Sequence, residues 1–584
     1  MLSRSILRTA RLHAPRRALH TQTSGGLSRS STVYATAATL AFLASTGYIF
    51  ARPLELDGPK GVKGAKGSGH ARGATQTPQA EEQISYQEVQ KHNKLALLRI
   101  THSVTDFIPK HPGGDKIIIS NAGKDVTEIF ESLHAKGTLE KMLKPSQHVG
   151  SLDPSTAPAK SPEIEAEEQR VAEARAKLPP LSHVLNLNEF EELAQGVLNK
   201  TAWSYYRSAA DDEFAHMNNA LAFRRYWFRP RVLRGTKTID TSCEILGNSS
   251  TLPVFVSPAA MAGLGAPEGE LNITKGAGRM GIIQGISSNA SRSVDEIAEA
   301  RVDGAKQPLF FQASLCSGSY NLYVASDRAK SEKVIKHVEE LGYRAIFFTV
   351  DAPVLGNREL DQRNRANMID TGDDDEEEGQ KGGVASTIDG YFDAGIDWST
   401  LKWLKKTTKL PIILKGVQTV EDVELAAQHG VNAVLLSNHG GRQLDYAPAA
   451  IDVLYELRQK RPDLFDKMEI YVDGGVRRGT DVLKAMCLGA KGVGLGRTFL
   501  FANGTYGAHS FKYSNGLRGP ETICVGRLGE KGVVKAIRIL RNEIETGMRL
   551  LGVTRLDQLG PEMVEKVPYT EMPSGLYRSR PPSE

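Results

Sequence analysis

Short apolar runs recur along the C-terminal two-thirds of the chain, and segments with the period of an amphipathic helix separate them. Continuous apolar runs of this kind indicate strands that are buried on both faces, as in a parallel sheet. Eight such units over about 300 residues predict an α/β protein with a closed (β/α)8 TIM barrel rather than an open sheet. The runs occupy residues 254–256, 282–283, 309–311, 345–350, 411–414, 433–436, 469–472 and 492–495.

Polar and reactive residues follow most of these runs. The most informative segment, SNHGGRQLD, follows the run 433–436 and places His439 three residues before Arg442. An imidazole can remove a proton, and a guanidinium can hold a carboxylate with two hydrogen bonds. Because barrel enzymes carry their chemistry at the C-terminal ends of the strands, the segment predicts a catalytic loop for a small anionic substrate. The alternative is a loop that contains Asn, His and Gly without a catalytic role.

Glycine and arginine motifs end the seventh and eighth runs, DGGVRRG at 473–479 and LGR at 495–497. Glycine lets backbone N–H groups approach an anion closely, and Arg477 and Arg497 add positive charge. Phosphate is commonly bound at this place in a barrel. The motifs therefore predict a phosphate site, either for a phosphorylated cofactor or for a sugar-phosphate substrate.

A smaller module is predicted before the barrel. The motif HPGG places His111 on a tight turn, and His134 follows a helical segment at 125–133. Two histidines that face each other can supply both axial ligands of a haem iron, which favours electron transfer over substrate binding. The alternative is a pair of unrelated surface histidines.

The N-terminus has the composition of an import signal. The first 30 residues are rich in arginine, serine and alanine, and the first acidic residue is Glu55. This composition is typical of a mitochondrial presequence. The apolar stretch 33–50 is just long enough to cross a bilayer. The two features predict a bipartite signal for the mitochondrial intermembrane space, with a membrane anchor retained at 33–50 as the alternative.

Overall composition adds only a few constraints. Hydrophobic residues make up 40% and charged residues 24%, as in an ordinary globular protein. The net charge of +5 comes largely from the N-terminus, and no basic patch is interleaved with aromatic residues, so no nucleic-acid partner is predicted. The four cysteines have no CxxC spacing, which argues against a zinc site or a disulfide framework.

The chain is predicted to contain six successive regions. They are a presequence with an apolar sorting segment (1–52), a flexible linker (53–81), the haem module (82–152), a hinge with a short charged helix (153–180), the barrel (181–570) and a C-terminal tail (571–584).

These motifs together resemble two known families. The barrel segment 181–559, with TVD at 349–351 and LKG at 414–416 beside the two loop motifs, resembles the FMN-dependent α-hydroxy-acid dehydrogenases and oxidases. The pattern HPGGxxxxxxNAGKDVTxxFxxxH resembles the cytochrome-b5-like haem domain, a small α+β fold. The whole arrangement resembles the fungal flavocytochrome L-lactate dehydrogenases, which pass electrons to cytochrome c.

The resemblance implies a catalytic set around the substrate. His439 is the base that removes the α-hydrogen, as a proton or in a hydride-like step, and Asp351 orients it and raises the pKa of its imidazole. Helix capping is the alternative role for Asp351. Four more residues complete the set: Arg442 and Tyr205 at the substrate carboxylate (a core aromatic being the alternative for Tyr205), Tyr323 at its hydroxyl, and Arg358 as an added positive charge.

The resemblance also implies two cofactors, FMN and haem b, with His111 and His134 as the metal ligands. Lys415 lies beside N1 and the C2 carbonyl of the flavin, where a cation favours reduction; a solvated strand-end lysine is the alternative. The isoalloxazine is lined by Pro258, Ala259, Ala260, Ser287, Gln312, Thr349 and Ser437, and the ribityl phosphate by Asp473, Gly474, Arg477, Gly496 and Arg497.

The chain departs from the family pattern at several places. Inserted segments at 313–321 and 508–529 interrupt the family sequence, and we hypothesise that both are retained introns. The haem module is shortened between residues 93 and 107 and lacks the family's Trp there, which predicts a weakened sheet. Asn289 stands where lactate-specific relatives have an apolar residue, so another small 2-hydroxy acid is the second substrate candidate.

The predicted function is oxidation of L-lactate by FMN, with single electrons passed through the haem to cytochrome c. The resemblance implies a homotetramer, and the acidic segment 373–378 is expected to influence docking of a basic partner such as cytochrome c. Two alternatives remain. One is an oxidase that is reoxidised by oxygen, and the other is a haem electron carrier whose barrel is disabled by the insertion at 313–321.

Overall fold

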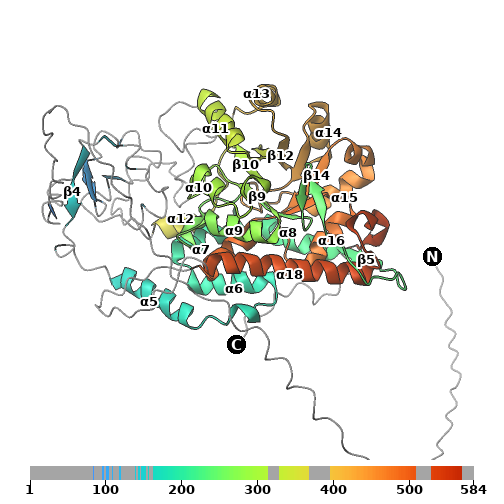
Figure 1. Cartoon of the computed structure of the whole chain (residues 1–584), viewed down its shortest axis with the longest axis horizontal. Coiled ribbons are helices and arrows are strands. Elements are labelled where there is room, and N and C mark those ends of the chain that lie inside the picture. Colours follow the sequence, from blue (N-terminus) through green and yellow to red (C-terminus); the bar gives the residue numbers. More distant parts are fainter. Residues whose placement is uncertain are drawn as a thin grey trace, which may run out of the picture. The chain divides into compact units, whose positions relative to one another are not determined.

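The computed structural model describes residues 162–313, 328–366, 395–507 and 528–568, four strands between 83 and 152, and a few single residues of that N-terminal part (Figure 1). The predicted presequence, linker, acidic segment and C-terminal tail lie outside the described residues, as do His111, His134 and Tyr323. Among the helices that are described, none combines the length and the apolar character that crossing a bilayer requires.

Eight parallel strands close into a barrel, which confirms the predicted (β/α)8 architecture. All residues of these strands are buried except the half-buried Glu469, and this explains why the sequence shows continuous apolar runs instead of alternation. The strands pair in chain order, and Val493 of the last strand pairs with Val254 of the first. They are β8 (Val254–Val256), β9 (Ile283–Ile286), β10 (Leu309–Ala313), β11 (Ala345–Thr349), β12 (Ile412–Val417), β13 (Ala433–Leu436), β14 (Glu469–Asp473) and β15 (Gly492–Leu495).

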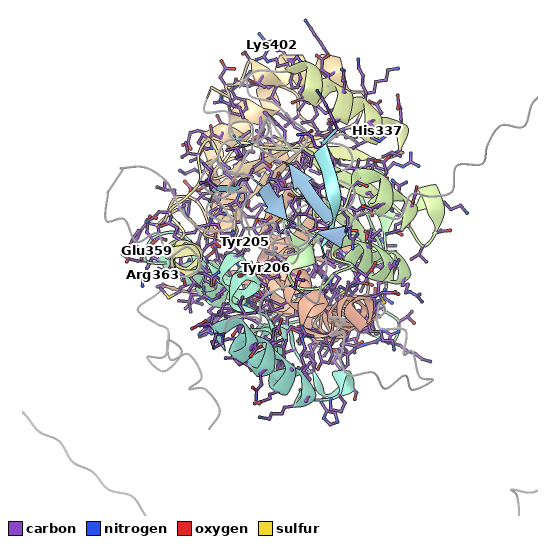
Figure 2. The ribbon with its side chains drawn as sticks, turned by 90° about the vertical axis from the view of Figure 1, so that its left-hand side faces the viewer. Tyr205, Tyr206, His337, Glu359, Arg363 and Lys402 are labelled. Atoms are coloured by element: carbon purple, nitrogen blue, oxygen red, sulfur yellow. The ribbon has the colours of Figure 1, made fainter. Side chains whose placement is uncertain are left out.

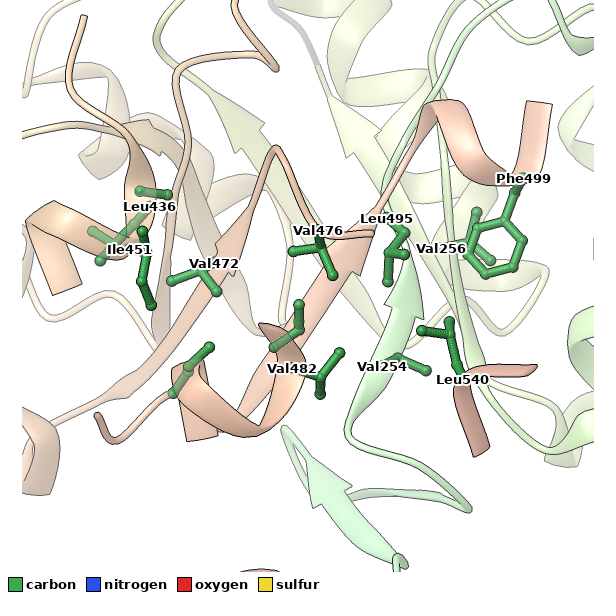
Figure 3. Close-up of a cluster of buried hydrophobic side chains, with 14 of the residues drawn as sticks. Val254, Val256, Leu436, Ile451, Val472, Val476, Val482, Leu495, Phe499 and Leu540 are labelled. Atoms are coloured by element: carbon green, nitrogen blue, oxygen red, sulfur yellow. The ribbon is translucent and has the colours of Figure 1, made fainter. Parts of the chain in front are cut away.

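Apolar side chains fill both the barrel interior and the space between the strands and the outer helices. In the interior, the rings of Phe255 and Phe347 lie with their centroids 6.0 Å apart, and Tyr471 packs edge-on against Phe255. Each aromatic ring buried in this way stabilises the fold by roughly 2 kcal/mol. Figure 3 shows part of this outer layer, including Val254, Val256, Val472, Val482, Leu495, Phe499 and Leu540.

Helices cover the outside of the barrel (Figure 1). The longest of them, α18 (Leu528–Leu551), packs against α9, α16 and α17 through an apolar stripe with helical spacing. The helices after the strands are α9 (Glu270–Met280), α10 (Val294–Glu299), α11 (Arg328–Glu340), α12 (Glu359–Ala366), α13 (Thr400–Thr407), α14 (Val420–Gln428), α15 (Ala450–Lys460), α16 (Gly479–Cys487) and α17 (Arg497–Thr505).

Both predicted insertions have one end inside a regular element. Ala313, the first residue of the segment 313–321, is the last residue of β10. Leu528 and Gly529, the last two residues of the segment 508–529, are the first residues of α18. The remaining residues of both insertions lie outside the described residues.

Among the described residues four α-helices precede the barrel strands, and the first of these four falls in the predicted hinge. This helix, α5, has the charged character that was expected, and Arg175 near its end donates hydrogen bonds to the carbonyls of Gly504 and Gly507 at 3.2 and 2.8 Å. Arg170 likewise donates hydrogen bonds to the carbonyls of Gly196 and Leu198, at the end of the next helix. Residues 162–176 are therefore a helix fixed to the barrel. The four helices are α5 (Pro162–Ala176), α6 (Leu187–Val197), α7 (Lys200–Arg207) and α8 (Phe214–Ala222).

Three small sheets complete the described structure. The hairpin of β6 (Cys243–Ile245) and β7 (Asn248–Ser250) packs Ile245 against the interior residues Phe255 and Tyr471. Strand β5 (Tyr226–Phe228) pairs with β16 (Val564–Lys566). In the N-terminal module, β1 (Gln83–Ile84), β4 (His148–Leu152), β3 (Ile100–Ser103) and β2 (Leu95–Leu97) form a sheet in that order.

Candidate active site

A cavity of about 290 Å³ opens at the C-terminal ends of the barrel strands. Polar groups from several strands converge on it, as the barrel architecture requires of a ligand site. Two predicted residues, Asp351 and Ser437, do not line the cavity, although both lie beside residues that do. The predicted residues that line it are Tyr205, Pro258, Ala259, Ala260, Ser287, Gln312, Thr349, Arg358, Lys415, His439, Arg442, Asp473, Gly474, Arg477, Gly496 and Arg497.

The loop that carries His439 has an unusual backbone. His439, Gly440 and Gly441 have φ angles of 57°, 67° and 79°, the left-handed region that glycine adopts readily and that costs other residues strain. Two side chains hold this conformation. The Ser437 hydroxyl accepts a hydrogen bond from the His439 N–H at 3.1 Å, and the Asn438 side chain accepts one from the Gly441 N–H at 3.1 Å. Ser437 thus supports the catalytic loop instead of lining the cavity.

His439, Asp351 and Lys415 form a compact cluster at the floor of the cavity. The Asp351 Oδ1 atom lies 3.0 Å from His439 Nδ1, and Lys415 Nζ lies 3.5 Å from the same nitrogen and 3.8 Å from Asp351 Oδ2. Because a carboxylate can only accept, Nδ1 carries the hydrogen of this bond. The other ring nitrogen, Nε2, therefore keeps its lone pair and can act as a base.

The electrostatics of this cluster favour a neutral base beside an ionised acid. Burial lowers the pKa of His439, Lys415 lowers it further, and Asp351 raises it only in part, so the net pKa is lowered. Asp351 thus raises the pKa of His439, as expected, but burial and Lys415 outweigh its effect. Burial raises the pKa of Asp351, but Lys415 and His439 together outweigh it, and the net pKa is lowered. At neutral pH the imidazole is uncharged and the carboxylate is charged.

Gly416 makes room for this cluster. Its φ is +102°, and a Cβ atom at this position would lie 2.4 Å from the Asp351 Cγ, far inside van der Waals contact. The pairing of β12 with β13 shifts between Lys415 and Val417, as at a β-bulge. The glycine of the LKG motif therefore lets the carboxylate lie against the end of β12, next to Lys415.

Two arginines and a tyrosine form the side of the cavity next to His439. Arg442 donates from Nη1 to the carbonyls of Tyr205 and Ser208 at 2.6 and 2.9 Å, and its Cζ lies 5.0 Å from the Tyr205 ring centroid. Within the described part of the chain its Nε and Nη2 form no hydrogen bond, so they can bind a carboxylate. Arg358 donates to the Gln443 side chain at 3.0 Å. Burial, followed by the charge of Arg442, lowers the pKa of Arg358 to about 9, which leaves it protonated at neutral pH.

The two adjacent tyrosines of α7, both labelled in Figure 2, make different contacts. Tyr205 lies beside Arg442, as the sequence predicted. Tyr206 donates its hydroxyl to the Met261 carbonyl at 2.6 Å and accepts from the Gly265 N–H at 2.9 Å. The second tyrosine therefore braces the loop after β8, although its ring also reaches the cavity.

The phosphate end predicted from the sequence carries an excess of positive charge and adjoins Arg442, because Arg442 and Arg497 both donate to the Ser208 carbonyl at 2.9 Å. Arg207, Arg477 and Arg497 line it together with His216, and their nearby acidic partners are Glu191 and Glu213. Arg497 is also the first residue of α17, whose first N–H groups have no acceptor within the helix. An anion such as a phosphate fits this end.

The part of the wall formed by Asp473 and the glycines after it suits a polyhydroxyl chain. Asp473 is 7% exposed, its Oδ2 accepts from the Ser257 hydroxyl at 2.9 Å, and its buried Oδ1 has no hydrogen-bond partner. Gly474 and Gly475 have φ angles of +90° and +78°, and a Cβ on Gly475 would lie 2.1 Å from the Asn219 carbonyl oxygen. An unpaired carboxylate oxygen at a cavity wall is satisfied by a hydroxyl donor.

The residues present therefore fit FMN. The arginine end and the start of α17 match its phosphate, Asp473 matches a ribityl hydroxyl, and small or apolar side chains such as Ala259 and Ala260 match a flat ring system. Gln312 and Thr349, both expected at the ring, are linked by a hydrogen bond of 2.7 Å.

Sequence reasoning missed several residues of the cavity wall. His216 is the clearest case, because its Nδ1 lies 3.2 Å from Arg497 Nη1, yet no motif surrounds it in α8. Burial, followed by Arg497, lowers the pKa of His216 to about 2, so the ring is neutral. The other missed lining residues include Arg207, Met217, Ala220, Ala352 and Leu355. Tertiary packing brings these residues to the cavity, and no local sequence pattern indicates it.

Comparison with known proteins agrees with this geometry. The profile of the FMN-dependent dehydrogenase family matches residues 194–513 and 520–566, and that of the cytochrome b5-like haem/steroid-binding domain matches 85–153. An L-lactate dehydrogenase (cytochrome) of Wickerhamomyces anomalus is 44% identical over 82% of this chain and 79% of its own length. The enzyme of that name from Saccharomyces cerevisiae is 42% identical over 83% of this chain and 80% of its own.

Solved structures show the same relationship. The flavin-binding domain of flavocytochrome b2 from baker's yeast superposes with a TM-score of 0.58 at 42% identity, covering 70% of this chain and 92% of that one. The family profile covers more than half of the chain, including all eight barrel strands. This chain belongs to the FMN-dependent dehydrogenase family and carries a cytochrome b5-like domain ahead of its barrel.

Proposed function

We propose that this protein oxidises L-lactate to the 2-oxo acid with FMN and passes the electrons through a b-type haem to cytochrome c. The observation that carries the proposal is the cluster of His439, Asp351 and Lys415 beside Arg442 in one cavity. The similarity to two L-lactate dehydrogenases (cytochrome) over most of the chain supports the substrate and the acceptor.

Different residues of the site bind the substrate and accept its proton. Arg442 binds the substrate carboxylate with the two nitrogens that form no hydrogen bond to the described protein, and the cation–π contact fixes Tyr205 beside it. His439 Nε2 then accepts a proton from the substrate. Asp351 stabilises the imidazolium that results, because its carboxylate is 3.0 Å from Nδ1.

FMN, when bound, would take up the two electrons and the second proton that leave the substrate. Lys415 supplies a buried positive charge at the cavity floor, where it stabilises negative charge that develops during the reaction. Buried side chains such as Gln312 and Thr349 exclude water from the same region.

Electron transfer to cytochrome c is proposed from the N-terminal module. The cytochrome b5-like profile matches residues 85–153, which include both His111 and His134 as the proposed axial ligands. Since FMN collects two electrons and cytochrome c accepts one, a haem in between divides the pair. The mitochondrial intermembrane space is proposed as the location, on the basis of the arginine-rich N-terminus and the apolar stretch 33–50.

A homotetramer is proposed as the assembly, with support from the protein surface. Phe214 and Tyr446 stack with ring centroids 4.6 Å apart while remaining 44% and 67% exposed. Leu444, in the same loop as Tyr446, is 73% exposed. Exposed apolar groups that gather in this way are typical of a subunit contact. Light scattering of the purified protein, with Phe214→Ser as a disrupting variant, measures the assembly directly.

The proposed reaction is tested by an anaerobic absorption spectrum of the purified protein before and after L-lactate. The expected result is bleaching of the flavin followed by reduction of the haem, with D-lactate as the inactive control. Bleaching of the flavin alone would support the oxygen-dependent oxidase instead. No bleaching would support the haem carrier with a disabled barrel. Sequencing of the mature transcript decides separately whether the segments 313–321 and 508–529 are translated.

A further inference from the structure

Glu270 is a buried carboxyl group for which the proposed reaction has no use. It is the first residue of α9 and is only 2% exposed. Within the described residues no Lys, Arg or His forms an ion pair with it. A carboxyl that is buried without an ion-pair partner is costly unless it is uncharged or well hydrogen-bonded, so its position calls for a physical reason.

Its first oxygen joins two loops of the cavity wall. Glu270 Oε1 accepts hydrogen bonds from the Ala262 N–H and from the Ser291 N–H, each at 3.0 Å. Ala262 belongs to the loop after β8, and Ser291 belongs to the loop after β9. These loops carry Ala260 and Asn289, which both line the large cavity. One oxygen atom thus links two segments that are distant from each other in the sequence.

The same two loops also contact each other directly. The Met261 N–H donates to the Asn289 carbonyl at 3.2 Å, and the Gly263 N–H donates to the Ser291 hydroxyl at 2.9 Å. The approach at Gly263 is so close that a Cβ there would lie 2.7 Å from the Ser291 Oγ. Glu270 therefore lies beside a wall whose two halves are in contact at residues 261–263 and 289–291.

Its second oxygen points into a separate, smaller cavity. Glu270 Oε2 and the Gln284 side-chain oxygen are both buried without a hydrogen-bond partner, and both residues line a cavity of about 10 Å³. Ala259 and Ser287 line this small cavity as well as the large one. Two acceptors cannot bond to each other, but a proton on Oε2 makes it a donor. That donor can be linked to the Gln284 oxygen through one water in the shared cavity, for which about 10 Å³ is just sufficient.

We infer that Glu270 is a positioning residue that holds the loops after β8 and β9 together in its uncharged form and so sets the places of Ala260 and Asn289. Burial raises the pKa of this carboxyl, in agreement with the unpaired oxygens. The inference rests on the proposed function only in taking this wall to belong to the flavin and substrate site.

The test compares Glu270→Gln with Glu270→Ala. Glutamine keeps one acceptor oxygen and places a donor where the protonated oxygen is, whereas alanine removes both. We expect Glu270→Ala to speed hydrogen exchange in peptides covering 258–266 and 287–293, and to weaken FMN binding, each by about tenfold, since two buried hydrogen bonds are lost. In turnover, it should raise the KM for the hydroxy acid more than it lowers kcat. Glu270→Gln should stay within about twofold of the unmodified protein in each measurement.

A matched control is Glu268→Ala, two residues earlier, whose side chain binds neither loop in the described structure. It should leave exchange and FMN affinity unchanged. A Glu270→Gln variant as impaired as Glu270→Ala would show that an ionised carboxylate is required, and an unimpaired Glu270→Ala would show that the loops are held otherwise. Either result would overturn the inference.

The test still gives a result if Glu270→Ala does not fold or if the proposed function is wrong. If Glu270→Ala does not fold, the free energy of unfolding of Glu270→Gln is compared with that of the unmodified protein between pH 5 and 8. A carboxyl with a raised pKa in the folded state loses stability as pH rises, so the unmodified protein should weaken relative to the glutamine variant, and a constant difference would refute the inference. Exchange and FMN affinity need no lactate, so a failure of the proposed function leaves this test intact.

Discussion

Asp351→Asn tests the proposed chemistry most directly, because it removes one charge while nearly preserving the shape of the side chain. The Asp351 side chain is 0% exposed, and its two oxygens lie 3.0 Å from His439 Nδ1 and 3.8 Å from Lys415 Nζ. The asparagine oxygen can still accept the Nδ1 hydrogen. What is lost is the negative charge that stabilises the imidazolium.

The magnitude follows from the type of hydrogen bond. A bond to a charged group contributes about 1.5–3 kcal/mol, and this contribution is needed only after His439 has taken up the proton. At about 1.4 kcal/mol for each factor of ten, the rate of flavin reduction should fall roughly 10- to 150-fold. Substrate binding should change little, because Arg442 donates its hydrogen bonds to Tyr205 and Ser208 and not to Asp351.

The assay is anaerobic stopped-flow reduction of the bound flavin by L-lactate across a range of pH. Since Asp351 raises the pKa of His439 against the effects of burial and Lys415, its loss lowers that pKa further. The acidic limb of the kcat/KM profile should therefore move to lower pH while the plateau falls. Asp445→Asn is the control, because this carboxylate of the same loop binds the N–H groups of Phe214 and Ala215 instead. A plateau within twofold of the unmodified enzyme, or a limb that moves to higher pH, would refute the reasoning.

Three further predictions concern the cavity. Lys415→Met should lower the two-electron reduction potential of the bound flavin by on the order of 30–60 mV in a spectroelectrochemical titration, and an unchanged potential would remove its electrostatic role. Asn289→Leu should raise kcat/KM for L-lactate about tenfold relative to a hydroxy acid with a polar side chain; an unchanged ratio would separate Asn289 from specificity. The neutral His216, with a pKa lowered to about 2, should cost the protein about 2 kcal/mol of stability between pH 7 and 5, since only the unfolded chain takes up the proton. Denaturant unfolding checks this, and His216→Asn should flatten that slope.

Much of the barrel follows from local sequence, because a strand buried on both faces must be apolar throughout. Each of the eight predicted runs coincides with one of the strands β8 to β15. The catalytic loop was also predictable, since only glycine adopts the backbone of residues 440 and 441 without strain. Such features depend on residues that are close together in the chain.

Other features depend on contacts that no local pattern encodes. His216 and Glu270 reach their places through the packing of whole helices, and neither lies in a recognisable motif. The lowered pKa of His439 is a further example. The resemblance pointed to Asp351, but the net direction is set by burial and by Lys415, which arrives on a different strand. The pKa of a group at the mouth of the barrel depends on charged residues from several strands, whereas a sequence motif describes only one strand.

The missing side chain at Gly416 separates what can vary in this site from what cannot. A single methyl group at that position would overlap the Asp351 carboxylate. His439, Asp351 and Lys415 can therefore keep their spacing only if residue 416 is glycine. The Asn289 side chain is less restricted, because it is half-buried and lines the cavity. Substitutions at residue 289 can therefore change which hydroxy acid is bound, while His439, Asp351 and Lys415 keep their arrangement.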